Sequence, residues 1–306
     1  MPSPGVRDLG MQLGQYWIER RLGGDLSPEV TRDRLVSGLY LARDTELNLE
    51  VVLRILPRGF SDPARMQRIV QRTNAAFALK HRNVATIYEI GAASGEWFVA
   101  TEYVQGEPLH ARTGGYPLSA ADIAGIAIQV ADALIHAHGR GIVHGDITPS
   151  NIMVSPGGQV KLVNFGLGRE LTDDMLDWPE WTDMMLLEFV RYISPEQLMN
   201  GEEDSRSDLF SLGIVLYEIA TGRHPFPGQD PPLAEYSHFI RARITREKPD
   251  AITRLNAKVP AELERIIHQC LEKDLERRYQ SACDLAVDLK NIDDNMGTRS
   301  VQTQKL

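Results

Sequence analysis

The residues with the clearest chemical potential lie in two short stretches, "HGDITPSN" and "NFG". The first stretch places His144, Asp146 and Asn151 on one loop, with the acid and the amide five residues apart. The second stretch starts at Asn164, eighteen residues after Asp146. An amide oxygen can coordinate magnesium, but it brings no charge, and magnesium sites favour carboxylates. Asn164 could therefore offer a metal ion only a neutral ligand.

The elements that must position these stretches fall into two halves. From Tyr16 to about Tyr103, short runs rich in β-branched and aromatic residues predict a small sheet, and one helical pattern starting near Asp62 interrupts them. Beyond this region the chain is mainly helical, with Ser119 as a predicted N-cap and Gly222 as a predicted helix end. Two short strands, "NIMVS" and "VKLVNF", are joined by a "PGG" turn. Further helices are predicted at about 233–247, 261–273 and 281–292.

The composition narrows the class of protein. The chain has 306 residues, 42% of them hydrophobic and 25% charged, which is typical of a globular protein with a sizeable core. Its net charge of -9 argues against a nucleic-acid partner or an anionic membrane surface. Cys270 and Cys283 are too few for a disulfide framework, so we expect reduced thiols and a cytoplasmic location. The most apolar stretch, residues 121–139, carries two aspartates and predicts a buried amphipathic helix, with no membrane segment.

Three further motifs follow in order along the chain: "SPE" at Ser194–Glu196, "SDLFSLG" with Asp208, and "ERRYQS" with Arg278. Together with the first two stretches they resemble the protein kinase family across roughly residues 14–292, and especially the bacterial serine/threonine kinases. One H-x-D-x-x-x-x-N match would be weak, but five motifs in register are a strong signal.

The resemblance implies an α+β, two-lobed protein kinase fold. Its small lobe, 14–103, would be β-rich with one main helix, and its larger lobe, 106–292, would be helical. Residues 1–13 would then be an N-terminal extension and 293–306 a polar tail.

The resemblance also assigns roles to individual residues. Asp146 matches the catalytic residue that accepts the proton of the substrate hydroxyl. Asn151 and Asn164 match the two metal-binding positions. Glu196 and Arg278 match a pair that supports the helical lobe. The positions that bind ATP in the family are occupied here by Val52, Arg54, Thr101, Glu102, Val104 and Met153.

Several departures from the family affect phosphate and adenine binding. Arg54 stands where a lysine holds the α- and β-phosphates, and a bulky guanidinium fork cannot copy a compact ammonium. Val52 replaces a small alanine above the adenine, so extra methyl groups intrude there. Arg72 aligns with the glutamate that should pair with the lysine, and Arg54 facing Arg72 would repel. Thr148 replaces the lysine that neutralises the γ-phosphate.

Two loops also differ from the pattern of the family. The segment between Leu22 and Tyr40 is about nine residues longer than a G-x-G-x-x-G hairpin needs, and Ser37 replaces its last glycine. Gly145 occupies the position of an arginine that binds a phosphothreonine of the activation segment in many active kinases. Activation by that phosphorylation would therefore lack its binding residue.

The segment between Asn164 and Glu196 is acidic, and Trp178, Trp181 and several methionines are interleaved with its acids. One interpretation is a short helix that buries its tryptophans against the large lobe. Another is a docking surface for a protein partner, because Trp and Met are favoured at interfaces. A third is that the acidic segment folds into the emptied cleft, toward Arg54 and Arg72.

The departures remove metal, phosphate and positioning groups together, and phosphoryl transfer depends on those groups. The sequence therefore predicts a pseudokinase, a regulatory or scaffolding module with a protein partner such as an active kinase. Its binding of ATP and Mg²⁺ would be weak or absent. The alternative is a divergent serine/threonine kinase that uses Asp146 as base, Asn151 and Asn164 for one metal ion, and Arg54 for phosphates. A middle case binds nucleotide without transferring phosphate.

Overall fold

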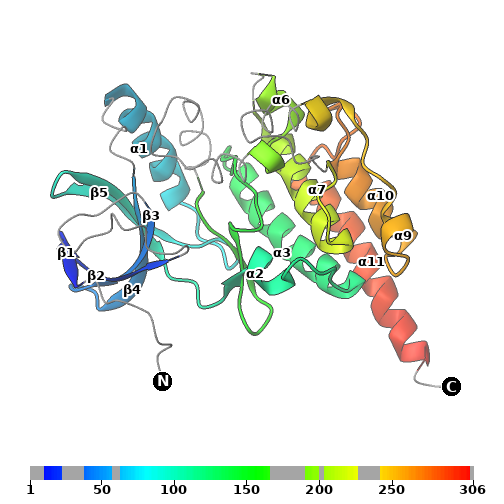
Figure 1. The fold of residues 1–306 in the computed structure, drawn as a ribbon, viewed down its shortest axis with the longest axis horizontal. Helices are drawn as coiled ribbons and strands as arrows, with labels where there is room; N and C mark the ends of the chain where they lie inside the picture. The colour runs from blue at the N-terminus through cyan, green and yellow to red at the C-terminus, as the bar shows by residue number, and fades with distance from the viewer. Residues whose placement is uncertain are drawn as a thin grey trace. The chain divides into compact units, whose positions relative to one another are not determined.

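The computed structural model describes residues 10–22, 38–56, 63–165, 190–199, 203–226 and 242–303, with the backbone alone for 63–65 and 293–303. Contacts along the chain divide it into two compact units. We call Met1–Lys80 with Ala85–Gln105 the sheet unit, and His81–Val84 with Gly106–Leu306 the helical unit (Figure 1).

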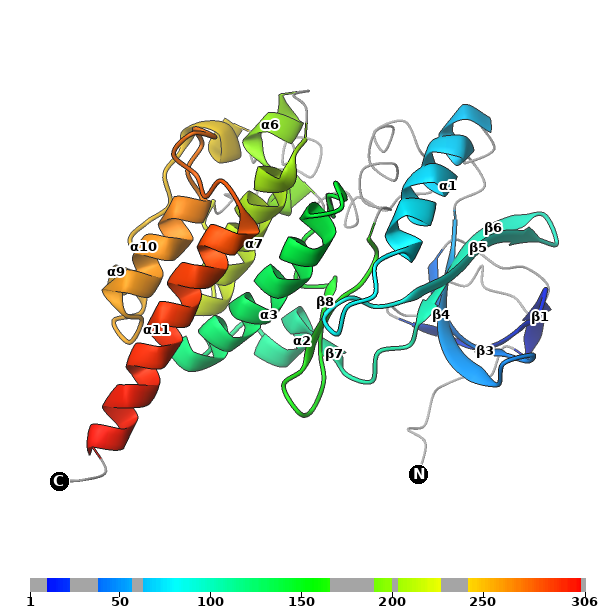
Figure 2. The same ribbon diagram turned by 180° about the vertical axis from the view of Figure 1, so that it is seen from behind.

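The described part of the sheet unit forms six antiparallel strands in the order β1-β2-β3-β4-β6-β5, and helix α1 packs against β5 (Figure 2). The bounds are β1 (Met11–Leu13), β2 (Tyr16–Leu22), β3 (Gly38–Asp44), β4 (Leu49–Ile55), α1 (Pro63–Phe77), β5 (Ile87–Ala93) and β6 (Glu96–Glu102). The β-branched and aromatic runs of the sequence account for these strands.

Alternation along β4 sorts its side chains between the two faces of the sheet. Val51, Leu53 and Ile55 are buried in an apolar core that also holds Tyr16 and Phe98. The rings of Tyr16 and Phe98 meet edge to face, with their centroids 5.4 Å apart. Because successive side chains of a strand point to opposite faces, the intervening residues of β4 lie on the face away from this core.

The helical unit is built around α3 (Ala120–His138), which packs against α7 (Ser205–Thr221) and α11 (Ala282–Thr303) (Figures 1 and 2). The Ser119 hydroxyl caps α3 by accepting a hydrogen bond from Asp122 N, as the sequence predicted. Gly222 ends α7 in the left-handed conformation, also as predicted. The other described elements are β7 (Glu107–Pro108), α2 (Leu109–Thr113), β8 (Ile152–Val154), β9 (Val160–Leu162), α6 (Pro195–Leu198), α9 (Ile252–Leu255) and α10 (Ala261–Cys270).

Helix α3 is the one helix of the described residues that is long and apolar enough to cross a membrane. Half of its apolar stretch is buried inside the protein, including Ile123, Val130 and Leu134. This burial agrees with the buried amphipathic helix that the sequence predicted for the stretch.

The bounds of β1 and α11 differ from the sequence-based expectation, and α10 ends at Cys270 rather than near residue 273. Strand β1 starts at Met11, inside the segment assigned to an N-terminal extension, because it pairs with β2 from Met11 opposite Ile18 to Leu13 opposite Tyr16. Helix α11 continues to Thr303 rather than ending near Ile292. Residues 293–303 contain no proline to stop a helix, and their polar composition alone did not reveal it.

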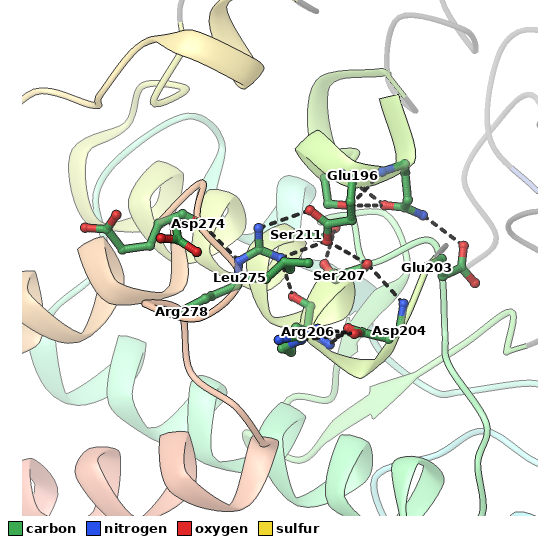
Figure 3. A network of polar contacts seen from close by, with 12 residues as sticks. Glu196, Glu203, Asp204, Arg206, Ser207, Ser211, Asp274, Leu275 and Arg278 are labelled. Atoms are coloured by element: carbon green, nitrogen blue, oxygen red, sulfur yellow. Dashed lines mark hydrogen bonds and ion pairs between the residues drawn. The ribbon is translucent and has the colours of Figure 1, made fainter. Parts of the chain in front are cut away.

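A buried ion pair ties the start of α6 to the segment before α11 (Figure 3). The Arg278 guanidinium donates to both carboxylate oxygens of Glu196, at 2.8 and 3.1 Å, and to the main-chain oxygen of Arg206 at 2.9 Å. The hydroxyl of Ser207 donates to Glu196 at 2.7 Å. Burial alone would raise the pKa of Glu196, but the hydrogen bonds and charge of Arg278 outweigh burial and hold this pKa below its usual value.

We expect Arg278→Met to lower the free energy of unfolding by about 3–5 kcal/mol, because it leaves the Glu196 carboxylate buried without its cation. Urea denaturation measures the change. The double variant Glu196→Gln, Arg278→Met removes the charge as well and should recover part of the loss. Equal stability of the single variant and the wild type would contradict this account of the pair.

His224 holds the chain that precedes α6 through an uncharged imidazole. Its Nε2 lies 2.9 Å from the main-chain oxygen of Arg191, and its Nδ1 accepts from Phe226 N at 3.1 Å. The accepting Nδ1 carries no proton, so Nε2 is the donor. Burial lowers the pKa of His224 to about 3.

This depressed pKa predicts a loss of stability in acid. Between pH 6.5 and pH 3 the unfolded chain binds a proton at His224 that the folded protein excludes, so stability falls as the pH falls. Between pH 7 and pH 5 we expect protonation of His224 to lower the free energy of unfolding by about 2 kcal/mol. The variant His224→Gln should lack this part of the pH dependence. NMR titration of the ring gives a second measurement. A ring that titrates near its ordinary pKa would contradict the prediction.

Candidate functional site

The loop from His144 to Asn151 is fixed by one carboxylate of α7. Asp208 accepts hydrogen bonds from the main-chain N–H groups of His144 and Gly145, each at 2.9 Å, and its carboxylate lies 2.7 Å from His138 Nε2. Burial would raise the pKa of Asp208, but the hydrogen bond from His138 and the neighbouring charges lower it overall. The carboxylate therefore stays ionised and clamps the start of the loop.

Asp146, Asn151 and Asn164 form a continuous chain of hydrogen bonds. Asn151 Nδ2 donates to the main-chain oxygen of Asp146 at 2.8 Å and to its carboxylate at 2.7 Å. Asn164 Nδ2 then donates to Asn151 Oδ1 at 2.6 Å. The three residues singled out by the sequence for the base and the metal positions are thus brought together.

The backbone on both sides of Asn164 is anchored. His144 Nε2 donates to the main-chain oxygen of Val163 at 2.9 Å, and the His144 ring packs on the Phe165 ring with centroids 4.4 Å apart. Burial lowers the pKa of His144, so the ring serves as a neutral bridge. Asn164 itself has φ +69°, in the left-handed region that asparagine tolerates better than most residues.

Gly145 and Glu203 meet at the position where the family resemblance expects an arginine. Gly145 has φ +76°, and a Cβ built on it would lie 3.2 Å from Glu203 Oε1. Glu203 also accepts a hydrogen bond from Gln197 Nε2 at 3.0 Å. A carboxylate therefore borders the place of the missing guanidinium, and this would repel a phosphate rather than bind it.

In the sheet unit, the register places three predicted ATP-site residues on one face. Val52 on β4 is opposite Thr101 on β6, and Arg54 is opposite Val99. Directly opposed residues share a face. The Thr101 hydroxyl donates to the main-chain oxygen of Val52 at 3.4 Å, which is a long hydrogen bond.

The remaining predicted ATP-site residues lie at the end of β6, in the connection that follows it, or in the helical unit. Glu102 ends β6, and its carboxylate accepts from Thr86 N at 3.0 Å. Val104 is buried. Met153 belongs to β8, where it is opposite Lys161. Arg72 lies on α1 with a half-buried side chain, and its predicted repulsion with Arg54 stays a prediction.

Some predictions concern residues outside the described ranges. These are the lengthened loop with Ser37, residues 233–241 of the helix predicted at about 233–247, and the acidic segment with Trp178 and Trp181. The described end of that predicted helix, residues 242–246, is helical. The three interpretations of that acidic segment stay open.

Sequence reasoning missed two features of the site. Glu203 lies far from Gly145 in the chain, and nothing in "NGEED" indicates that it covers a glycine of the loop. The second is the direction of the hydrogen bonds from Asn164 to Asn151 and from Asn151 to Asp146. A carboxylate can only accept hydrogen bonds, and this chemistry could have suggested the direction.

Comparison with known proteins identifies the family. A model described as the protein kinase domain matches residues 36–288. This chain belongs to the protein kinase family. Its kinase domain is 33% identical over 283 residues to the serine/threonine-protein kinase PrkC of Bacillus subtilis, covering 92% of this chain and 41% of that protein.

Other relatives and a solved structure agree. The kinase domain is 33% identical over 264 residues to the serine/threonine-protein kinase PknB of Mycolicibacterium smegmatis, covering 84% of this chain and 41% of that protein. The chain thus spans about two-fifths of the length of these relatives. The crystal structure of the Mycobacterium tuberculosis PknI kinase domain matches with a TM-score of 0.68 and 19% identity, covering 94% and 99% of the two chains. The predicted two-lobed kinase fold is confirmed.

The family uses magnesium, but the donor set of this kinase domain does not suit that ion. The amide oxygen of Asn151 already accepts an N–H from Asn164, and an N–H group cannot ligate a metal. Among the described residues, no group of three His, Cys, Asp or Glu side chains is placed to hold a metal ion. Asp146 supplies the one carboxylate of the Asp146–Asn151–Asn164 chain.

We expect Gly145→Ala to destabilise the kinase domain by about 1–2 kcal/mol, because φ +76° is costly for a residue with a Cβ. Gly158→Ala is the matched control, since Gly158 has φ +78° but open space around its Cβ position. The difference between the two variants in urea denaturation isolates the contact with Glu203. A Gly145→Ala protein as stable as the wild type would contradict the assigned conformation.

Proposed function

We propose that this kinase domain is catalytically impaired and acts as a regulatory or scaffolding module in signalling, with weak or absent ATP binding. The observation that carries the proposal is the loss of charge around Asp146. Thr148 and Asn164 are neutral where the family has a lysine and an aspartate, and Asn164 offers an N–H to Asn151. Phosphoryl transfer depends on stabilising and positioning charge, so these replacements act on the same step.

Three further replacements support this reading. Arg54 stands at the lysine position of β4, and Arg72 stands at the aligned glutamate position of α1. Gly145 occupies the position of the arginine that would bind a phosphorylated activation segment, and the Glu203 carboxylate lies next to that position. The loss therefore extends to the phosphate clamp and to a common way of switching the enzyme on.

A regulatory role implies a protein partner, such as an active kinase. We further propose a cytoplasmic location, since both cysteines are free thiols. Burial raises the pKa of Cys270 to about 12, which suits an inert structural thiol.

A divergent serine/threonine kinase is the second candidate, and one observation favours it. Asp146 and Asn151 are both retained and remain joined by a hydrogen bond of 2.7 Å, so a base and an amide are still held together. The names of the relatives, serine/threonine-protein kinases, agree with such an activity.

Nucleotide binding separates these candidates. A ligand at a hundredfold its dissociation constant stabilises a protein by about 2.7 kcal/mol, and we expect Mg-ATP to give no such increase in the denaturation midpoint. The variant Arg54→Lys, Asn164→Asp restores one cation and one carboxylate, so Mg-ATP should stabilise it more than the wild type. Stabilisation of the wild type by ATP without magnesium, together with no transfer of phosphate, would instead indicate nucleotide binding without transfer.

A further inference from the structure

We propose that the side-chain amide of Asn164 replaces a divalent cation: its N–H group holds Asn151 and Asp146 in place, so that the loop is ordered without metal. The inference rests on the proposed function and deepens it. A single residue, Asn164, then decides whether this site takes an internal amide or a divalent cation.

The chemistry of Asp146 fixes the direction of the chain. Its carboxylate and its main-chain oxygen can only accept hydrogen bonds, so Asn151 must present Nδ2 to both of them, at 2.7 and 2.8 Å. The oxygen of the Asn151 amide then faces the other way. Asn164 must in turn present its own Nδ2, which lies 2.6 Å from Asn151 Oδ1. Reversing either amide would place two acceptors against each other.

Asn151 is held so that it cannot simply turn away. Its side chain is buried, its main-chain N–H donates to Thr148 O at 3.0 Å, and its main-chain oxygen accepts from Val163 N at 3.0 Å. These bonds fix the residue on the segments before and after it. The amide oxygen therefore keeps one outward direction, and the group at position 164 must satisfy it.

The partially positive N–H of Asn164 does there what a cation would do. It attracts the oxygen of Asn151 and completes a chain of hydrogen bonds that runs from two neutral amides to the carboxylate of Asp146. No ion has to lose its water shell for this chain to form. Hard divalent cations such as Mg²⁺ bind oxygen atoms and favour carboxylates. To admit such an ion, Asn164 would have to rotate, break the 2.6 Å hydrogen bond and offer a neutral oxygen in exchange.

An aspartate at position 164 would favour a bound cation over the internal hydrogen bond. Its carboxylate would face Asn151 Oδ1 with no proton between the two oxygens, while Asp146 retains the Nδ2 group of Asn151. Two acceptors in contact repel, and a bound divalent cation relieves the repulsion by accepting both oxygens as ligands. The same substitution thus removes an internal bond and creates a metal site.

The test compares the purified wild-type chain with Asn164→Asp and Asn164→Gly. Glycine is the matched control, because it tolerates φ +69° but supplies neither an amide nor a carboxylate. Urea denaturation is followed in EDTA and in MnCl₂, and Mn²⁺ binding is followed by electron paramagnetic resonance. We expect no effect of Mn²⁺ on the wild-type midpoint. Asn164→Asp should unfold at lower urea than the wild type in EDTA, and Mn²⁺ should raise its midpoint.

Asn164→Gly should also unfold at lower urea, and Mn²⁺ should not raise its midpoint. The inference is overturned if Mn²⁺ stabilises the wild type as much as Asn164→Asp, or if Asn164→Asp in EDTA equals the wild type. If Asn164→Asp does not fold, the side-chain amide signals of wild-type Asn151 and Asn164 decide. They should stay sharp in Mn²⁺, and their paramagnetic broadening would overturn the inference.

The outcomes separate this inference from the proposed function. Phosphate transfer by the wild type together with the expected response to Mn²⁺ would refute the proposed function and leave the role of Asn164 intact. A wild type that neither transfers phosphate nor binds ATP but is stabilised by Mn²⁺ would refute only the role of Asn164.

Discussion

The buried carboxylate of Asp208 is the constraint on which the site depends. It accepts hydrogen bonds from the N–H groups of His144 and Gly145 and contacts His138, so the loop from His144 to Asn151 is attached to α7 at its first two residues. The other end of the loop is held by the hydrogen bond from the Asn151 side chain back to the main-chain oxygen of Asp146. The Gly145 backbone lies in the left-handed region at this point, which a glycine adopts without strain.

The helical unit has the contacts that support its fold, while several residues at the charged positions of the family differ. The Glu196–Arg278 pair and the His144–Phe165 contact are well formed, and each is structural. The replaced positions are those that handle charge on phosphate or metal, at Arg54, Thr148 and Asn164. A scaffold needs the structural contacts but does not need the residues that handle charge on phosphate or metal. This division explains how a kinase fold can persist without a magnesium-binding carboxylate at position 164.

Much of the fold could be predicted because its signals are local. Ser119 and Gly222 mark helix ends through their own capping chemistry, and the alternation of β4 shows which of its side chains enter the core. The contacts between distant segments could not be predicted in this way. Glu203 approaches Gly145 only after the chain has folded, and the contact of Asn164 with Asn151 depends on the folded positions of their two segments.

Transfer of radiolabelled phosphate from ATP, to the protein itself and to a generic protein substrate, tests the central claim most directly. Asp146→Ala is the control, because Asp146 is the one residue that could serve as base in this chain of hydrogen bonds. The account predicts that the wild type incorporates no more label than Asp146→Ala. Label incorporated by the wild type and abolished in Asp146→Ala would contradict it and establish an active kinase.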